Sequence, residues 1–172
     1  MNANRPVILI VDDTPDNIML LASLLKEKYD TKVATSGATA LRIVGAGGVD
    51  LVLLDVTMPG LDGLEVCRRI VGEPRTADVP VLLLTAKSRP EDEAGGLAAG
   101  AADYIGRPVN PPILLARVAT HLALRVARRG LERCNAELEA LRAHGGEVTG
   151  EVADEVAGNR AGDGAAAAGT PK

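Results

Sequence analysis

Short apolar runs alternate with stretches of helical spacing along the first 124 residues of the chain. The strongest runs are residues 7–11, 51–54 and 79–84, which are rich in Val, Ile and Leu, a composition typical of strands buried on both faces of a parallel sheet. Weaker strands are expected at 32–35 and 103–105. Helices are expected from Pro15, with Thr14 as its cap, over 38–44, 64–71 and 91–99, and from Pro111 or Pro112 onward. This alternation predicts an α/β fold with helices on both faces of the sheet.

Polar residues stand where the predicted strands end. Asp12 and Asp13 follow the first strand, Asp55 follows the third, Thr85 follows the fourth and Arg107 comes soon after the fifth. Ligands of open parallel sheets bind beyond the carboxyl ends of the strands, beside the point where the strand order reverses. The sequence therefore predicts a single polar site at this edge of the sheet.

The three aspartates of this edge suggest a metal site. An acidic pair in a turn is usually solvated, but a third carboxylate from another strand makes a cluster that needs a cation. Oxygen ligands with room for water and phosphate suit a hard divalent ion, best Mg²⁺. A carboxylate beside such an ion can attack phosphorus and form an acyl phosphate, and the Thr85 hydroxyl could donate to a phosphoryl oxygen.

Four motifs, VILIVDDTPDN, DLVLLDVTMPGLDG, PVLLLTA and the end of GAADYIGRP, occur in this order and at consistent spacing. Over about residues 6–124 the chain resembles the receiver domain of two-component response regulators, of the chemotaxis-receiver kind. The resemblance implies a flavodoxin-like (βα)5 fold, a doubly wound parallel sheet of order 2-1-3-4-5. It also implies that a sensor histidine kinase or phosphotransfer protein passes a phosphoryl group to Asp55 and that the domain then changes conformation.

The same resemblance assigns roles to individual residues. Asp55 is the phosphoacceptor, and Asp12, Asp13, Asp55 and the backbone carbonyl of Thr57 hold Mg²⁺. Thr85 is the switch hydroxyl, and Tyr104 is the aromatic residue that moves with it. The chain has two tyrosines and no Phe or Trp, so an aromatic side chain at this position carries more weight than usual.

Arg107 departs from the family pattern, which has Lys before the proline that follows the fifth strand. Lysine is a compact point charge on a thin stem, whereas the arginine guanidinium is planar and favours bidentate contacts. We expect Arg107 to contact the phosphoryl group with a changed reach, and therefore to alter the rate or weaken transmission to Thr85 and Tyr104.

Two other functions compete with that of a phosphoacceptor. A phosphorylation-independent scaffold or dimerisation module with a receiver-like fold is the alternative, and Arg107 is its only support. An aspartate-nucleophile phosphatase would need a second acid where Thr57 stands. We expect no enzyme activity beyond the chain's own phosphoryl transfer and dephosphorylation, because no output enzyme domain is evident.

The C-terminal third of the chain changes character. Six residues spaced 3-4-3-4-3 form an a/d heptad seam; they are Leu124, Ala127, Leu131, Cys134, Leu138 and Leu141. Glu137 and Arg142 fall at g and the following e position. We therefore divide the chain into a receiver domain (1–124), a helical extension (125–144) that could form a homodimeric coiled coil, and a disordered Ala/Gly-rich tail (145–172).

The overall charge limits the partners. The net charge of −4 makes nucleic acid an unlikely partner, although Arg125, Arg128, Arg129 and Arg133 form a local basic stretch that we expect to be a solvated helix face. The apolar run near the N-terminus is too short for a membrane span or a signal-peptide core. We expect no membrane association and a cytoplasmic location, with His121 at the helix surface and both cysteines reduced.

Overall fold

The computed structural model describes the backbone of residues 5–86 and 98–158, and the side chains of this part up to residue 144. Five strands are present, β1 (Val7–Val11), β2 (Asp30–Ala34), β3 (Leu51–Asp55), β4 (Val81–Thr85) and β5 (Asp103–Gly106). The labelled helices are α1 (Pro15–Leu25), α2 (Gly37–Gly45), α3 (Gly63–Gly72) and α5 (Pro111–Gly158). The helix expected at 91–99 lies mostly outside the described residues.

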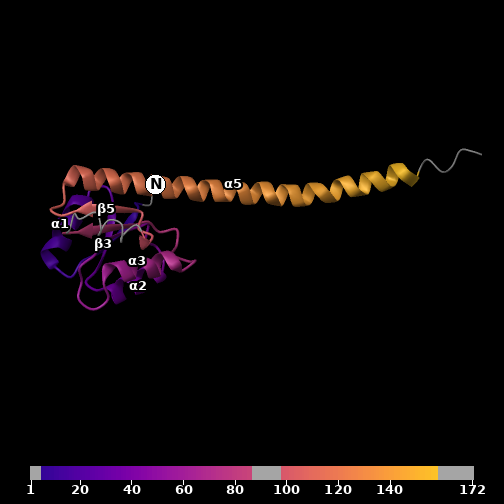
Figure 1. The fold of residues 1–172 in the computed structure, drawn as a ribbon. Coiled ribbons are helices and arrows are strands. Elements are labelled where there is room, and N and C mark those ends of the chain that lie inside the picture. Colours follow the sequence, from indigo (N-terminus) through magenta and orange to yellow (C-terminus); the bar gives the residue numbers. More distant parts are fainter. Residues whose placement is uncertain (1–4, 87–97, 159–172) are drawn as a thin grey trace, which may run out of the picture. The chain divides into compact units, whose positions relative to one another are not determined.

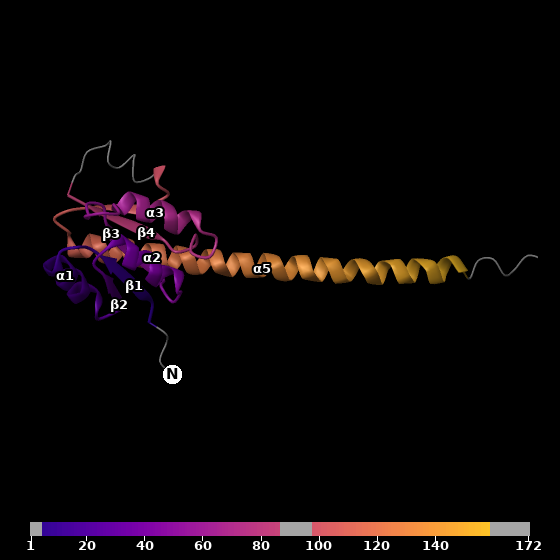
Figure 2. The same cartoon turned by 90° about the horizontal axis from the view of Figure 1, so that it is seen from below.

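All five strands form one parallel sheet in the order β2-β1-β3-β4-β5. This order confirms the flavodoxin-like fold. Alternate strand residues face opposite layers, so Leu9 and Leu54 pack with α2 and α3, whereas Ile10 and Leu53 pack with α1 and the start of α5. Figures 1 and 2 show α2 and α3 together on one side of the sheet. Every residue of β3 and β4 is buried, because helices cover both faces of these central strands.

The observed strands begin and end close to the predicted positions, with two differences. β2 starts at Asp30, two residues before the expected start, because Asp30 N donates to Pro6 O and Asp30 pairs with Val7 of β1. β4 starts at Val81 and not at Val79, because Pro80 has no N–H to donate to the ladder. Val79 is still buried, which explains why the apolar run extends beyond the strand.

The helices that surround the site begin in different ways. Thr14 is the N-cap residue of α1, as expected, but its side chain makes no capping hydrogen bond and contacts Asp13 instead. At the start of α3, by contrast, Asp62 accepts a hydrogen bond from Glu65 N at 2.8 Å. Pro15 fixes the first turn of α1, so this helix does not depend on the missing side-chain cap.

Helix α5 joins the sheet through charged contacts that the sequence did not reveal. Arg125 was expected on a solvated face, yet its side chain is only 8% exposed and binds Asp50 at 2.6 Å and Asp78 at 3.2 Å. His121 was expected at the surface, yet it is mostly buried and lies 3.0 Å from Asp103 of β5. Both expectations were wrong because periodicity alone does not show which carboxylates the sheet brings against this helix.

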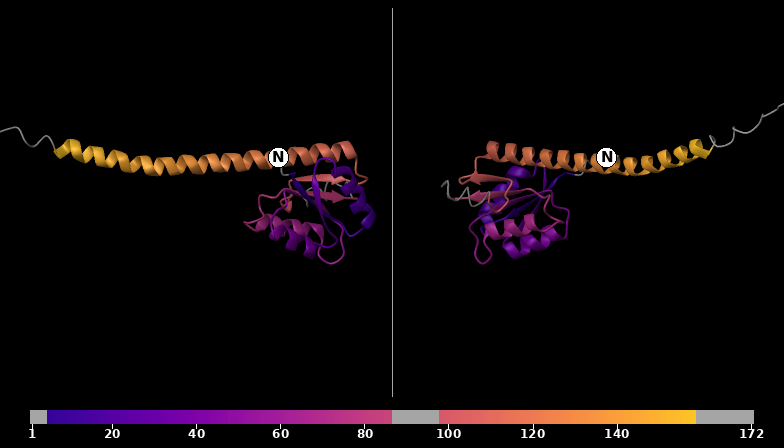
Figure 3. Two further views of the ribbon diagram at one scale, coloured as in Figure 1. Left: turned by 180° about the vertical axis from the view of Figure 1, so that it is seen from behind. Right: turned by 45° about the vertical axis from the view of Figure 1, so that its right-hand side comes forward.

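The chain divides into two compact units between Ala127 and Arg128. Helix α5 begins in the first unit and its residue range extends into the second. Both views of Figure 3 show the first turns of this helix lying along the sheet of the first unit. Helix α5 also includes residues 145–158, where we expected disorder. This difference arises because adding residues to an existing helix avoids the cost of nucleation. The segment also holds Ala and Glu, which favour helices, beside its glycines. Residues 159–172 of the expected tail lie outside the described residues. Among the described helices, none is both long and apolar enough to cross a membrane.

Candidate functional site

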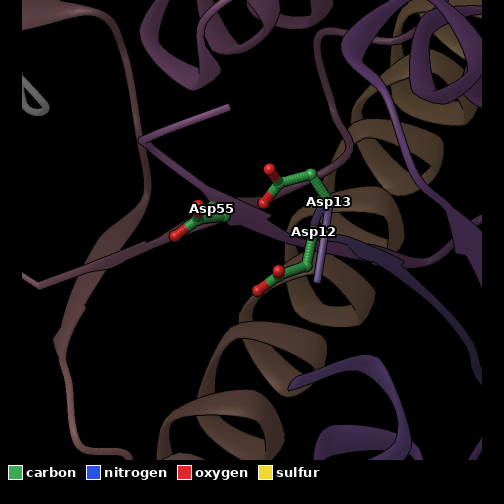
Figure 4. A group of neighbouring side chains, drawn as sticks. All are labelled: Asp12, Asp13 and Asp55. Atoms are coloured by element: carbon green, nitrogen blue, oxygen red, sulfur yellow. The ribbon is translucent and has the colours of Figure 1, made fainter. Parts of the chain in front are cut away.

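Three carboxylates meet at the carboxyl edge of the sheet. Asp12 and Asp13 directly follow β1, and Asp55 is the last residue of β3, the neighbouring strand. Because Val11 pairs with Leu54, the residues that follow this pair come together. One oxygen from each aspartate lies within 4.8 Å of the others, and Figure 4 shows the three side chains converging. Asp12 and Asp55 are buried, whereas Asp13 is exposed, so the cluster opens to solvent on one side.

Asp12 is held in place by its own loop and helix. One carboxylate oxygen, Oδ1, accepts hydrogen bonds from Thr14 N at 2.9 Å and from Asn17 Nδ2 at 3.1 Å. The other oxygen, Oδ2, contacts the Arg107 guanidinium. Since Oδ1 is occupied by hydrogen bonds, Oδ2 is the atom of this buried side chain through which Asp12 meets a cation.

Asp55 is the most electrostatically perturbed group of the site. Its pKa rises from 3.8 to about 6, chiefly because burial penalises the charged form. Arg107 lowers this pKa, the charges of Asp12 and Asp13 raise it, and a hydrogen bond from the backbone of Thr57 lowers it. A positive charge beyond that of Arg107 would therefore favour the ionised, nucleophilic form of Asp55.

Arg107 lies among the aspartates. Its Nη2 atom contacts Asp12 Oδ2 and is 3.5 Å from Asp55 Oδ1, and its side chain is 18% exposed. The Nε atom is buried and has no hydrogen-bond partner among the described residues. The guanidinium thus contacts Asp12 more closely than Asp55. Its Nε–H group is the donor left without a partner.

The remaining predicted residues belong to β4, to β5 and to the loop after β3. Thr85 ends β4 and is 3% exposed, and its carbonyl accepts a hydrogen bond from Arg107 N at 2.7 Å, which ties the end of β4 to the loop after β5. Tyr104 of β5 is half-buried against the core cluster on the α2 and α3 side. Thr57 is placed beside Asp55 by its backbone hydrogen bond. Asp12, Asp13, Asp55, Thr57, Thr85 and Arg107 thus lie at or just beyond the carboxyl ends of the strands, whereas Tyr104 lies within β5 opposite Leu83.

Comparison with known families decides the classification. The model of the response regulator receiver domain matches residues 8–119, more than half of the chain. The chain belongs to the receiver domain family of response regulators. The matched segment contains all the strands except the first residue of β1, and all the site residues described above.

Individual relatives agree with this classification. A Vibrio cholerae protein named "Probable cyclic di-GMP phosphodiesterase" is 46% identical over 140 residues, which cover 80% of this chain and 32% of that protein. The response regulator PleD of Caulobacter vibrioides is 43% identical over 112 residues, covering 64% of this chain and 25% of PleD. This receiver chain therefore spans about a third and a quarter of the length of these two relatives.

Solved receiver structures show the same fold. The chemotaxis protein CheY4 of Vibrio cholerae superimposes with a TM-score of 0.64 at 28% sequence identity, over 67% of this chain and 97% of that chain. Receiver domains bind Mg²⁺ at an acidic site. The three converging carboxylates of this domain offer the hard oxygen ligands that such an ion prefers, so they fit it.

Two residues of this receiver's site were missed by sequence reasoning. Sequence reasoning assigned no role to Asn17, although its position in the first turn after the acidic loop lets its amide reach Asp12. Gly63 was likewise assigned no role in the site. A Cβ atom at Gly63 would clash with the carbonyl oxygen of Asp55 and lie 2.8 Å from Val56 Cα, so this glycine lets α3 begin against the end of β3. The signal for Gly63 was present, since a glycine directly after a capping aspartate permits such an approach.

Proposed function

We propose that this protein is a phosphoacceptor response regulator whose Asp55 takes a phosphoryl group from a sensor histidine kinase or a phosphotransfer protein. The observation that supports this most directly is the placement of Asp55 at the end of β3, within reach of Asp12, Asp13 and Arg107. Membership of the receiver family supports the same reaction class. A cytoplasmic location goes with this proposal, because that is where such kinases present their phosphohistidine.

In the proposed reaction a carboxylate oxygen of Asp55 attacks the phosphorus atom. The phosphorus–nitrogen bond to the donor histidine breaks, its electron pair stays on the ring nitrogen, and an acyl phosphate forms. Asp12, Asp13, Asp55 and the carbonyl of Thr57 would hold Mg²⁺, which supplies positive charge against the phosphoryl oxygens. Asn17 positions Asp12 through its hydrogen bond to Oδ1.

Arg107 has two tasks in this proposal. Before phosphorylation it neutralises the cluster by binding Asp12 and approaching Asp55. Afterwards it donates to a phosphoryl oxygen, because a phosphoryl group adds about −1.5 to −2 charges and strong acceptors beside it. The Thr85 hydroxyl donates to another oxygen and Tyr104 moves with it, which carries the signal along β4 and β5. Because the guanidinium is planar, the contact of Arg107 with the phosphoryl group differs in geometry from that of a lysine ammonium group.

The test uses the full chain, Mg²⁺ and a small phosphodonor such as acetyl phosphate. Intact mass should increase by one phosphoryl group, and the increase should be absent from Asp55→Asn and from reactions with EDTA. Asp62→Asn is the matched control, because Asp62 is an aspartate that caps α3 without belonging to the cluster. Modification of Asp55→Asn to the same extent would contradict the proposal. The phosphorylation-independent scaffold is not favoured, since it gives no reason for an intact acidic cluster.

We also propose that the extension of α5 forms a homodimer. On this helix Leu131, Leu138 and Leu141 are 62%, 47% and 69% exposed. Paired apolar seams of this kind bury such side chains in coiled coils. Light scattering should show a dimer that becomes a monomer when Leu131 and Leu138 are both replaced by Gln. Met19→Gln, on a 67% exposed residue of α1, should leave the dimer intact; a wild-type monomer would refute the pairing.

A further inference from the structure

The apolar stripe on the extension of α5 is narrow. Leu131, Cys134, Leu138 and Leu141 are all exposed, and none belongs to either core cluster of the described residues. Their spacing places two apolar positions in each heptad on one side of the helix. A stripe of this width matches a two-helix seam, whereas a helix covered by a globular core needs a wider apolar face.

The rest of the helix surface between residues 128 and 144 carries charged side chains and alanines. Arg128 and Glu132 form an ion pair at 3.1 Å, and each side chain is about three-fifths exposed. Arg129 and Arg133 lie on the side away from the seam. Between residues 128 and 144 the large apolar side chains all lie on the seam. An apolar partner therefore contacts this part of the helix along the seam, and a second copy of this chain presents the same narrow stripe.

Charges that flank the seam distinguish the two possible orientations of a pair. With Leu124 at position a, the e positions hold Arg128, Asn135 and Arg142, and Glu137 is at g. In a parallel pair g faces the following e position of the other helix, so Glu137 faces Arg142 of the second copy. In an antiparallel pair e faces e, which sets arginines against arginines. Within the described residues neither Glu137 nor Arg142 has an ion-pair partner.

On the basis of the proposed homodimer, we propose that two copies pair parallel and in register along this seam, which places Cys134 of one copy opposite Cys134 of the other. Positions a and d pair with themselves only in this arrangement. Oxidation would then link the copies: the two thiols give up two protons and two electrons to the oxidant, and one sulfur–sulfur bond forms. The seam thus contains a thiol pair that exists only in the dimer.

Oxidation of the full chain with diamide, which is reduced to its hydrazine, tests whether the two Cys134 side chains lie opposite each other. A covalent dimer should form within minutes, disappear on reduction and be absent from Cys134→Ala. Cys67 should not contribute, because it is completely buried and burial raises the pKa of its thiol to about 11. In the Cys134→Ala background, Ala136→Cys places a thiol on the outer side of the helix and should not cross-link. Cross-linking as fast from this outer position would overturn the proposal.

A charge exchange tests the orientation independently. Glu137→Arg sets arginine against Arg142 in a parallel pair and should weaken self-association roughly tenfold. Glu137→Arg combined with Arg142→Glu should restore it. A dimer by light scattering that neither cross-links through Cys134 nor responds to these changes overturns the parallel register while leaving the dimer standing. A monomer overturns the pairing itself, and neither result bears on whether Asp55 accepts phosphate.

Discussion

At the scale of single residues, Arg107 and a divalent cation compete for the same carboxylate. The guanidinium contacts Asp12 Oδ2, the oxygen not bonded to Thr14 and Asn17. We expect Arg107→Gln to bind Mg²⁺ about tenfold more tightly, because both the competing contact and a nearby positive charge are lost. Titration calorimetry measures this directly, with Arg107→Lys, which keeps the charge, as the intermediate case. Equal affinity in wild type and Arg107→Gln would show that the guanidinium does not occupy the ion's position.

Asp55 should make stability depend on pH. Its pKa is raised to about 6, so the folded state binds the proton more tightly than the unfolded state. Below about pH 4 the Asp55 carboxyl is protonated in both states and does not lower the free energy of unfolding. As the pH rises from there towards 6, the unfolded state loses the proton first and the free energy of unfolding falls. Asp55→Asn lacks this penalty and should be more stable by about 1–3 kcal/mol at pH 7 in EDTA. Urea unfolding at pH 4.5 and 7 measures it; an unchanged difference between the two proteins at both pH values would contradict the shifted pKa.

At the scale of elements, the start of α3 fixes the backbone of Asp55. A methyl group at Gly63 clashes with the Asp55 carbonyl and approaches Val56 Cα, and backbone cannot yield as a side chain can. Gly63→Ala should therefore destabilise the fold by about 2–4 kcal/mol. Gly72→Ala, at the other end of the same helix with open space around it, should be neutral or slightly stabilising in the same denaturant titration. Equal effects would show that α3 can move away from β3.

Helix α5 is attached to the sheet by Arg125. This nearly buried guanidinium bridges Asp50, which also accepts a hydrogen bond from Val7 N, and Asp78. Arg125→Gln leaves two carboxylates without their cation and should lower stability by about 2–4 kcal/mol. Arg128→Gln, which removes an exposed ion pair three residues later, should cost less than about 0.5 kcal/mol. Similar costs for both changes would mean that solvent already screens the Arg125 contacts.

At the scale of the whole molecule, the features that could be predicted are those that the order of apolar and polar residues along the chain determines. Buried strands, helix spacing and the aspartates at strand ends are local features, and they were enough to expect the fold and the carboxylate cluster. The particular ion pairs that join distant segments were not predicted. The reach of Arg125 to Asp50 and of Arg107 to Asp12 depends on how side chains cross between elements, and no periodicity records this. The closeness of α3 to β3 needed the structure to explain why residue 63 is glycine.

Chemical trapping of the Asp55 carboxylate tests most directly whether this residue accepts the phosphoryl group. After incubation with Mg²⁺ and acetyl phosphate, borohydride reduces an aspartyl phosphate to homoserine, and peptide mass spectrometry locates the converted residue. We expect conversion at Asp55, with Asp12 and Asp13 unchanged. Conversion at either neighbour, or a stable phosphorylated protein with no converted aspartate, would contradict it.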